Sequence, residues 1–318
     1  MRRVFFVSCV LVALTALIAW LAPKLFAPPE QPRPEADAAV TITVLQDGAA
    51  RTCPLSEWLP GVLAAEMPAS FEPEALRAQA VAARTYILER AAHRPAAHPD
   101  ADVCDDPGCC TAWLSDAEMQ ARWGEDAQEN FARITAAVAD TDGEILQYDG
   151  APIRAVFHSS SAGQTESSAA LWGELPYLVS VPSPESAADV PNYVSTLELT
   201  ADDLRATLLA AYPDCALPED PAAWFGAPQH DASGRVAAQP IGDTTLTGAE
   251  LRALLGLRST AYTVEYAEGV FRFTTTGYGH GVGLSQYGAN TMAGQGSGYA
   301  EILEHYYPGT MLCKLNAY

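Results

Sequence analysis

The chain contains almost no lysine, since Lys24 and Lys314 are the only two among its 318 residues. Lysine and arginine together number 18 against 39 aspartates and glutamates, which gives a formal charge of -21. Proteins that bind duplex DNA or RNA gain affinity by neutralising phosphates with clustered cations. The composition therefore excludes nucleic-acid binding as the main function. A hydrophobic content of 49% also excludes wholesale disorder.

The chain also lacks the motifs that mark several common enzyme classes. Its glycine-rich segment at residues 277–283 is followed by no Gly-Lys-Ser/Thr and fits no Gly-x-Gly-x-x-Gly register, which excludes a nucleotide-binding loop. No Gly-x-Ser-x-Gly elbow surrounds the serines at 159–161, and no His-Glu-x-x-His motif occurs anywhere. No internal repeat is visible.

The first 26 residues predict a single-pass membrane anchor. Arg2 and Arg3 precede an uncharged run over residues 4–23, and about 20 apolar residues span a bilayer core. The alternative is a cleaved signal peptide, whose apolar region is usually about 7–15 residues long. The positive-inside rule places the two arginines in the cytoplasm and the rest of the chain outside the cell membrane. Residues 27–39 predict a stiff proline-rich linker.

Helix starts are marked by side chains that can cap them. Ser115 with Glu118 and Thr247 with Glu250 form two capping boxes, each just ahead of a helical pattern. Residues 125–138 predict a further helix. These helices lie at irregular intervals along the chain.

Strand signals are interspersed with the helices. Residues 144–148 and 153–157 predict a hairpin through an Asp-Gly turn, and residues 270–276 predict another strand. Because strands and helices do not alternate regularly, the sequence predicts an α+β fold rather than a doubly wound sheet. We expect one catalytic domain over residues 40–318, with a peripheral lobe inserted at residues 182–240.

The first group of chemically active residues lies at a helix boundary. Pro68 stops a helix, which leaves Glu66 at its end, where the helix dipole does not favour a carboxylate. The helix that follows, over residues 73–88, is apolar on almost every side and is therefore expected to be buried. Arg84 lies within it. A buried arginine needs a carboxylate or an anionic ligand, so a structural ion pair with Glu66 or another acid is one interpretation.

Two further segments carry polar side chains on loops, where such groups can converge on a ligand. One delivers His158, Ser159 and Ser160 at the end of the predicted hairpin. The other places glycine at every second position from 277 to 283, which indicates backbone running close to a ligand or to other backbone. Ordinary turns are the alternative for both. The polar residues of the second segment are His280, Ser285, Gln286 and Tyr287.

A cysteine-rich loop over residues 98–110 predicts a structural zinc site. A set of three cysteines and one histidine fills a tetrahedral zinc shell and leaves no open position for a catalytic water. The rival interpretation is disulfides, which an oxidising exterior permits. Each loop cysteine would then need a distant partner among Cys53, Cys215 and Cys313. The predicted ligands are His98, Cys104, Cys109 and Cys110.

These motifs together resemble the stage II sporulation protein D family. The resemblance rests on Ala65-Glu66-Met67-Pro68, on residues 76–86, on Phe157-His158-Ser159 and on residues 279–288. It extends from about residue 40 to residue 315 and is interrupted mainly at residues 182–239.

The resemblance implies a lytic transglycosylase that acts during sporulation on peptidoglycan glycan strands stripped of their stem peptides. By analogy Glu66 is the catalytic acid and base. It protonates the oxygen linking MurNAc to GlcNAc and then takes the proton from the MurNAc C6 hydroxyl as that oxygen attacks C1. The product is a 1,6-anhydro-MurNAc end. Hydrolytic glycosidases use two carboxylates, whereas this internal attack needs only one.

The resemblance also implies a set of binding residues and a metal loop. The residues expected to line the glycan cleft are His158, Ser159, Ser160, His280, Ser285, Gln286 and Tyr287. We further expect Arg84 to face the substrate, where it would meet the lactyl carboxylate of MurNAc. The zinc loop of some family members has histidine where this chain has Cys109.

Two other functions remain open from sequence. Related amidase-enhancer proteins share these motifs, so the domain would then bind glycan or a cell-wall amidase and cleave nothing. A zinc amidase or peptidase is disfavoured by the closed ligand set. The expected partners are glycan strands, a cell-wall amidase and a membrane partner of the sporulation machinery, with no nucleic acid.

Overall fold

The structure is a computed structural model that describes residues 35–315. The predicted membrane anchor, residues 1–26, and the linker up to residue 34 lie outside the described residues. Within residues 35–315, no helix combines the length and the apolar character needed to cross a bilayer. The described chain is a mixed α+β fold with several small sheets, as the sequence predicts.

Two hydrophobic cores divide the described chain. We call residues 35–193 and 277–315 the main body, and residues 194–276 the second lobe. The elements of the main body are α2 (Glu35–Ala39), β1 (Thr41–Gln46), β2 (Ala49–Pro54), α3 (Leu55–Glu66), α4 (Pro73–His93), β3 (Val103–Cys104), α5 (Asp116–Trp123), η1 (Gly124–Asp126), α6 (Ala127–Asp140), β4 (Glu144–Tyr148), β5 (Ala151–Pro152), β6 (Phe157–His158), η2 (Ser168–Ala170), β13 (Leu284–Ser285), α9 (Gln286–Gly294), α10 (Tyr299–Tyr306) and β14 (Met311–Lys314).

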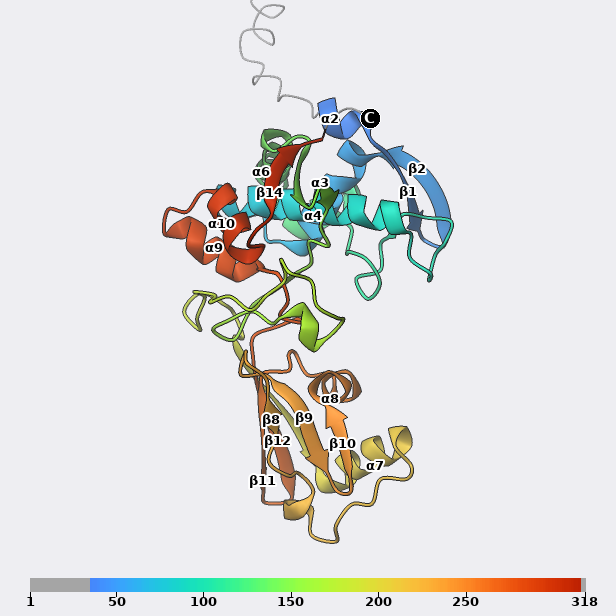
Figure 1. Cartoon of the computed structure of the whole chain (residues 1–318), viewed down its shortest axis with the longest axis vertical. Helices are drawn as coiled ribbons and strands as arrows, with labels where there is room; N and C mark the ends of the chain where they lie inside the picture. Colours follow the sequence, from blue (N-terminus) through green and yellow to red (C-terminus); the bar gives the residue numbers. More distant parts are fainter. Residues whose placement is uncertain (1–34, 316–318) are drawn as a thin grey trace, which may run out of the picture. The chain divides into compact units, whose positions relative to one another are not determined.

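The second lobe is one continuous stretch of chain, coloured yellow to orange in Figure 1. It contains the sheets β11-β12-β7 and β10-β9-β8. Its elements are β7 (Val194–Thr200), α7 (Ala201–Ala211), η3 (Pro221–Ala223), β8 (Gln229–His230), β9 (Val236–Ile241), β10 (Thr244–Thr247), α8 (Gly248–Leu255), β11 (Tyr262–Ala267) and β12 (Val270–Thr276).

The lobe has different boundaries from the predicted insertion at residues 182–240. Strand β7 pairs with β12 along its whole length, which ties residue 194 to residue 276. Along β12, Phe271 and Phe273 are buried while Arg272 between them is exposed, so alternation places both rings in the lobe's core. The predicted strand at residues 270–276 matches β12.

Helix α4 is the centre of the main body. Thirteen of its 21 residues are buried, many of them alanines that let neighbouring elements approach closely. Helices α3, α6, α9 and α10 and strand β4 all pack against it. In Figure 1, α9 and α10 lie beside one end of α4. The sequence prediction that this helix is apolar on every side and buried is confirmed.

Local signals in the sequence locate several helix boundaries correctly. Both predicted capping boxes are present, at the starts of α5 and α8. Helix α3 ends at Glu66, as the position of Pro68 predicts. The helix expected over residues 125–138 is α6, preceded by the short turn η1.

The predicted hairpin is only partly formed. Strand β4 pairs with β5 through Asp149 and Gly150, both at positive φ, but β5 is two residues long. The chain then leaves this sheet, and β6 pairs in parallel with β13. Main-chain pairing with a segment about 125 residues away in sequence therefore replaces the extended hairpin, and it brings the two predicted polar segments together.

Arg84 does not face a substrate, and that expectation is wrong. Its Nε and Nη2 atoms donate to the two carboxylate oxygens of Asp37 at 2.7 and 2.8 Å, and both side chains are fully buried. The carbonyls of Val138 and Glu144 accept further bonds from the same guanidinium. The bidentate ion pair and the two carbonyl hydrogen bonds together offset the desolvation free energy of the buried guanidinium. The structural interpretation holds, with Asp37 rather than Glu66 as the partner.

The position of Asp37 also changes the predicted end of the linker. Residues 35–39 form helix α2 and belong to the main body. Asp142 accepts the backbone N–H groups of Ala36 and Asp37 at 2.9 Å each, which caps the start of this helix. The domain therefore begins ahead of residue 40.

We predict that Asp37→Ala destabilises the fold by about 3–5 kcal/mol, because it leaves the Arg84 charge buried without a partner. The measurement is urea unfolding of the full-length chain followed by circular dichroism. Combining Asp37→Leu with Arg84→Met should cost less than either single change.

The control for this prediction is the exposed pair of Glu198 and Arg272 on the second lobe. Glu198→Ala should leave the unfolding midpoint nearly unchanged, because exposed ion pairs contribute little. Equal losses for the Asp37 and Glu198 variants would contradict the structural role of the buried pair.

Candidate functional site

Glu66, the last residue of α3, lines a cavity. Met67 adopts extended backbone angles and its side chain is buried, which turns the chain away from the helix and leaves Glu66 on its last turn. The cavity has a volume of about 460 Å³. Its polar lining consists of Glu66, Ser70, Arg122, Asn130, Ser159, Gln286 and Tyr287. We call this space the Glu66 cavity.

Two hydrogen bonds orient the Glu66 carboxylate. The backbone N–H of Ala112 donates to Oε1 at 3.0 Å, and Gln286 Nε2 donates to Oε2 at 3.4 Å. Burial raises the pKa of Glu66, and these two donors, which favour the charged form, oppose the rise. A carboxyl group with a raised pKa can hold a proton at a pH where an ordinary glutamate has lost it.

Glu66 is the one acidic side chain that lines this cavity in the described part of the chain. The predicted residues Ser159, Gln286 and Tyr287 lie in the same lining. The backbone N–H of Tyr287 donates to the Ser159 carbonyl at 3.0 Å, and its ring packs edge-on against Phe71. Gln286 and Tyr287 begin α9.

Arg122 supplies positive charge to the Glu66 cavity, and the sequence analysis did not single it out. It lies in the last turn of α5, is exposed, and donates to the Ala64 carbonyl at 3.2 Å. That carbonyl belongs to the last turn of α3, where a cation also complements the helix dipole. The only signal in the sequence is its position near the end of a predicted capped helix.

Arg133 shapes another wall of the cavity through the backbone. Its guanidinium donates to the carbonyls of Ala69 and Phe71 at 2.7 and 2.6 Å. These bonds fix the short connection between α3 and α4, whose residues Pro68 and Ala69 line the cavity. Arg133 is therefore a positioning residue.

His158 is buried and does not line the Glu66 cavity. Its Nδ1 is 3.2 Å from the Val282 carbonyl and its Nε2 is 2.7 Å from Ser161 Oγ. Because a carbonyl only accepts, Nδ1 carries the proton and Nε2 accepts from Ser161. Burial, together with nearby His280 and Arg235, lowers the pKa of His158 well below its usual value, so the ring is neutral.

Ser160 and Ser285 are also buried. Ser285 caps α9 by accepting from Gly288 N–H, and its hydroxyl donates to Glu185. His158, Ser160 and Ser285 are thus buried and are not among the residues that line the Glu66 cavity. The expectation that these three line the cleft is wrong, because their side chains are buried. His158 and Ser285 face each other in the parallel β6–β13 pairing, and Ser160 forms a bridge with Tyr278.

Glu185 belongs to the same buried group and was not predicted from the sequence. Its Oε1 accepts from the Ser161 backbone and from Ser285, and its Oε2 accepts from Ser183. Ser183 also contacts the Tyr306 hydroxyl at 2.8 Å. Glu185 lies in the stretch predicted as a variable insertion, and nothing local in the sequence distinguishes it from an exposed acid.

The alternating glycines allow close backbone approach, as predicted. A Cβ on Gly283 would lie 2.1 Å from the Val156 carbonyl, and one on Gly277 would lie 2.7 Å from the Ser160 carbonyl. Both glycines also have positive φ. This close approach brings the segment at 277–283 against the segment that carries His158.

His280 lines a different hollow. Val282 N–H donates to its Nδ1 at 3.1 Å, and its ring packs edge-on against Trp172 with centroids 5.1 Å apart. Burial lowers the pKa of His280 to about 4, with a further lowering from Arg252 and Arg235 and an opposing hydrogen bond with the Phe157 backbone. Its ring is therefore neutral near physiological pH and is not a cation for an anionic ligand.

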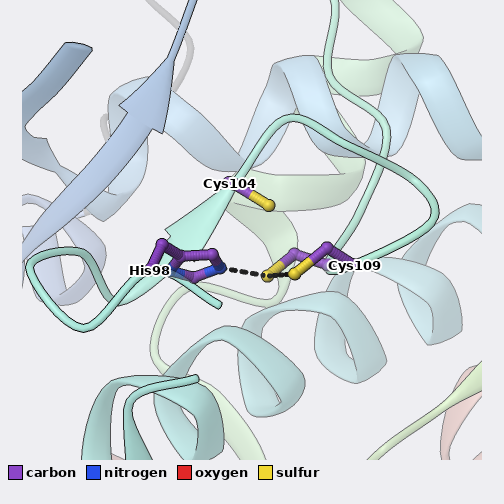
Figure 2. Close-up of side chains that lie close together, drawn as sticks. His98, Cys104 and Cys109 are labelled. Carbon is purple, nitrogen blue, oxygen red and sulfur yellow. Dashed lines mark hydrogen bonds between the residues drawn. The ribbon is translucent and has the colours of Figure 1, made fainter. Parts of the chain in front are cut away.

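The four predicted metal ligands converge in one cluster. Figure 2 shows His98, Cys104 and Cys109 pointing toward a common space, and the four ligand atoms lie within 4.8 Å of one another. His98 Nε2 is 3.2 Å from Cys110 Sγ, which is 4.0 Å from Cys109 Sγ. Two sulfurs on one tetrahedral zinc are about 3.8 Å apart, given Zn–S bonds of about 2.3 Å.

The surroundings of the cluster also fit a metal. His98 Nδ1 donates to the Ala101 carbonyl at 3.1 Å, and this bond holds the ring with Nε2 directed at the sulfurs. The six described cysteines are all free thiols, and Cys53, Cys215 and Cys313 lie in separate parts of the chain. This His/Cys cluster could hold a metal ion.

The chain is similar to a family of known proteins. A family model described as stage II sporulation protein matches residues 46–148, which include Glu66 and the metal cluster. Stage II sporulation protein D of Bacillus amyloliquefaciens is 36% identical over 288 residues, covering 89% of this chain and 81% of that protein. Its counterpart in Bacillus subtilis is 38% identical over 268 residues, covering 83% and 76%.

A more distant relative has a different name. A Bacillus subtilis protein named amidase enhancer is 28% identical over 306 residues, which cover 80% of this chain and 40% of that protein.

The fold and site define an α+β domain with one partly buried carboxyl in an open cavity beside a His/Cys cluster. The chain belongs to the stage II sporulation protein D family.

We predict that Glu66→Gln stabilises the fold near neutral pH. The raised pKa means that the protonated form favours folding, so this contribution is complete below about pH 4.5 and is lost as pH rises through the folded-state pKa. Glutamine resembles the protonated form at every pH. The thermal midpoint of the variant should therefore exceed that of the parent at neutral pH, and the two should converge in acid.

Glu57→Gln is the matched control, because Glu57 lies in the first turn of the same helix and is exposed. It should give no such gain. A parent and a Glu66→Gln variant with equal midpoints across the pH range would contradict the burial cost.

Proposed function

We propose that this chain is a lytic transglycosylase that cleaves MurNAc–GlcNAc bonds of peptide-stripped glycan strands and leaves 1,6-anhydro-MurNAc ends. The observation that carries this proposal is the single carboxyl group of the Glu66 cavity. Activating water or forming a covalent glycosyl intermediate takes a second carboxylate, whereas attack by the sugar's own hydroxyl does not. Membership of the stage II sporulation protein D family supports a role in sporulation.

Glu66 would serve first as acid and then as base. Its protonated carboxyl donates to the linking oxygen as the bond to MurNAc C1 breaks, and the resulting carboxylate accepts the C6 hydroxyl proton as that oxygen bonds to C1. The raised pKa assists the first step. The Ala112 and Gln286 donors stabilise the carboxylate formed between the steps and hold it in one orientation.

Arg122 would take the role that the sequence analysis gave to Arg84. It is the cation that lines the Glu66 cavity among residues 35–315, and it is exposed. A lactyl carboxylate on MurNAc is an anion that a guanidinium can hold with two parallel hydrogen bonds. A local cation is needed because the chain as a whole carries a charge of -21.

The His/Cys cluster would hold a structural zinc ion through His98, Cys104, Cys109 and Cys110. Zinc bound by four protein ligands stabilises the loop that carries them and takes no part in the reaction. That loop continues within two residues to Ala112, whose N–H binds Glu66. The ion would therefore help to keep the Glu66 carboxyl in place.

The cellular setting follows from the family and the N-terminal sequence. We propose that the chain acts in sporulation, anchored in the cell membrane by residues 1–26 with its catalytic domain outside. A cell-wall amidase that removes stem peptides is the partner that the substrate requires, and the similarity to the amidase enhancer supports that connection.

The second candidate function is a glycan-binding enhancer of such an amidase without cleavage of its own. The similarity to the amidase enhancer is the observation that favours it. The two candidates differ in whether a bond is broken, which product analysis decides.

We predict that the full-length chain releases anhydro ends from peptide-free glycan strands. Glu66→Gln should reduce the rate at least about a hundredfold, because general acid and base catalysis contributes roughly 10²–10⁴-fold. The products are measured by mass spectrometry.

Glu57→Gln on the same helix should retain full activity, which controls for loss of charge on α3. Reducing ends in place of anhydro ends would indicate a hydrolase. An intact strand after incubation with the parent chain would favour the enhancer.

We predict about one zinc ion per chain by elemental analysis of the purified protein. Cys104→Ala should lose most of the metal and lower the thermal midpoint, because closing a structural site contributes to folding. Cys313→Ala, which changes a cysteine on β14 outside the cluster, should retain it. Chelation that removes no metal, or removes it with fold and activity untouched, would contradict the structural zinc site.

A further inference from the structure

A second hollow lies next to the Glu66 cavity and is not used by the reaction described above. Its volume is about 210 Å³. Pockets for drug-sized ligands have volumes of roughly 300–1,000 Å³, so this smaller hollow suits a ligand the size of a single sugar ring. Trp172, His280, Phe157 and Tyr86 form its aromatic walls, and the metal loop at residues 107–111 closes one side. We call it the Trp172 hollow.

The two spaces are joined by two short stretches of chain. Thr111 lines the Trp172 hollow, and the next residue, Ala112, binds Glu66. Phe157 lines the Trp172 hollow, and Ser159, two residues further, lines the Glu66 cavity. Two residues of extended chain span at most about 7 Å. A linear polymer bound over Glu66 would therefore pass from one space into the other.

Trp172 offers an exposed aromatic face. It is 49% exposed, which is high for so large an apolar side chain. The turn that carries it is ordered, because the Ser168 carbonyl accepts the N–H groups of Leu171, Trp172 and Gly173. The edge-on contact with His280 holds the indole from one side. A fixed, exposed ring of this kind is a platform for a ligand with an apolar face.

The charge of the lining selects among sugars. No aspartate, glutamate, lysine or arginine lines the Trp172 hollow in the described part of the chain, whereas Arg122 lines the Glu66 cavity. The two sugars of a peptide-free strand alternate and differ in charge, since MurNAc bears a lactyl carboxylate and GlcNAc bears none. A carboxylate is favoured beside a cation and is costly to bury without one. Cys109 and Cys110 also line the hollow, and as thiolates on the proposed zinc ion they would disfavour a carboxylate as well. The sugar without a carboxylate therefore suits this lining.

We propose that the Trp172 hollow is the subsite for the GlcNAc unit next to the MurNAc held at Glu66, with the C–H face of the sugar stacked on the Trp172 indole. This inference rests on the proposed function and extends it by assigning the occupant of the neighbouring position. It also gives the metal loop a second role, since residues 107–111 form a wall of this subsite.

The test measures binding with cleavage blocked by Glu66→Gln in the full-length chain. Here the Glu66→Gln chain is the parent. Isothermal titration calorimetry with peptide-free glycan strands gives Kd for this parent and for the same chain that also carries Trp172→Ala, Trp172→Phe or Trp172→Leu. Loss of the ring should raise Kd about tenfold, as expected for an aromatic anchor at a binding site. Phenylalanine should retain most of the affinity, and leucine should lose it although it keeps apolar volume.

Two controls make the result specific. Met311→Ala removes another large exposed apolar side chain, 61% exposed on β14, and should leave Kd unchanged. The fold change caused by Trp172→Ala should not vary with salt, because a neutral sugar on an apolar ring is not screened. Neutral oligomers of N-acetylglucosamine should show the same dependence on Trp172.

The outcomes separate this inference from the proposed function. Equal Kd for Trp172→Ala, Trp172→Leu and the parent overturns the subsite, whether or not the active chain releases anhydro ends. Absence of anhydro ends overturns the transglycosylase, and the binding series still decides the subsite for a glycan-binding protein. If Trp172→Ala fails to fold, the Kd values of Trp172→Leu and Trp172→Phe decide the question, and equal values for these two variants overturn the subsite.

Discussion

The buried ion pair between Arg84 and Asp37 is the interaction on which the main body depends. It fastens α2 to the middle of α4, and α4 in turn supports α3, which carries Glu66, and α9, which carries Gln286 and Tyr287. A buried pair of this kind adds little net stability compared with apolar residues of similar size, but breaking it is costly. Its effect is therefore to fix one arrangement of the helices.

The pKa of Glu66 reflects a balance between burial and hydrogen bonding. Desolvation favours its neutral form, while the Ala112 and Gln286 donors favour its charged form, and burial is the larger effect. A residue that must be an acid in one step and a base in the next benefits from a small difference between the two forms. The donors come from the metal loop and from the start of α9, so two distant segments of the chain set that balance.

Short-range features were predictable from sequence, and long-range partners were not. Pro68 and the two capping boxes fix helix boundaries because their effects act within one turn. The metal ligands were found because they lie within thirteen residues. The partner of Arg84 was missed because many acids could have served. Ser285 was placed in the cleft because a motif shows that a hydroxyl is present but not which way it points. The assignment of cleft residues by resemblance is therefore only partly reproduced by the geometry.

The neutrality of His158 and His280 has a consequence for substrate charge. With both rings uncharged near physiological pH, the charged groups that line the Glu66 cavity among residues 35–315 are Glu66 and Arg122. Protonation of Glu66 then changes the net charge of that lining from zero to plus one. An anionic sugar binds better to the protonated form, and by thermodynamic reciprocity the bound sugar draws a proton onto Glu66. Under the proposed function, the substrate itself prepares the acid that cleaves it.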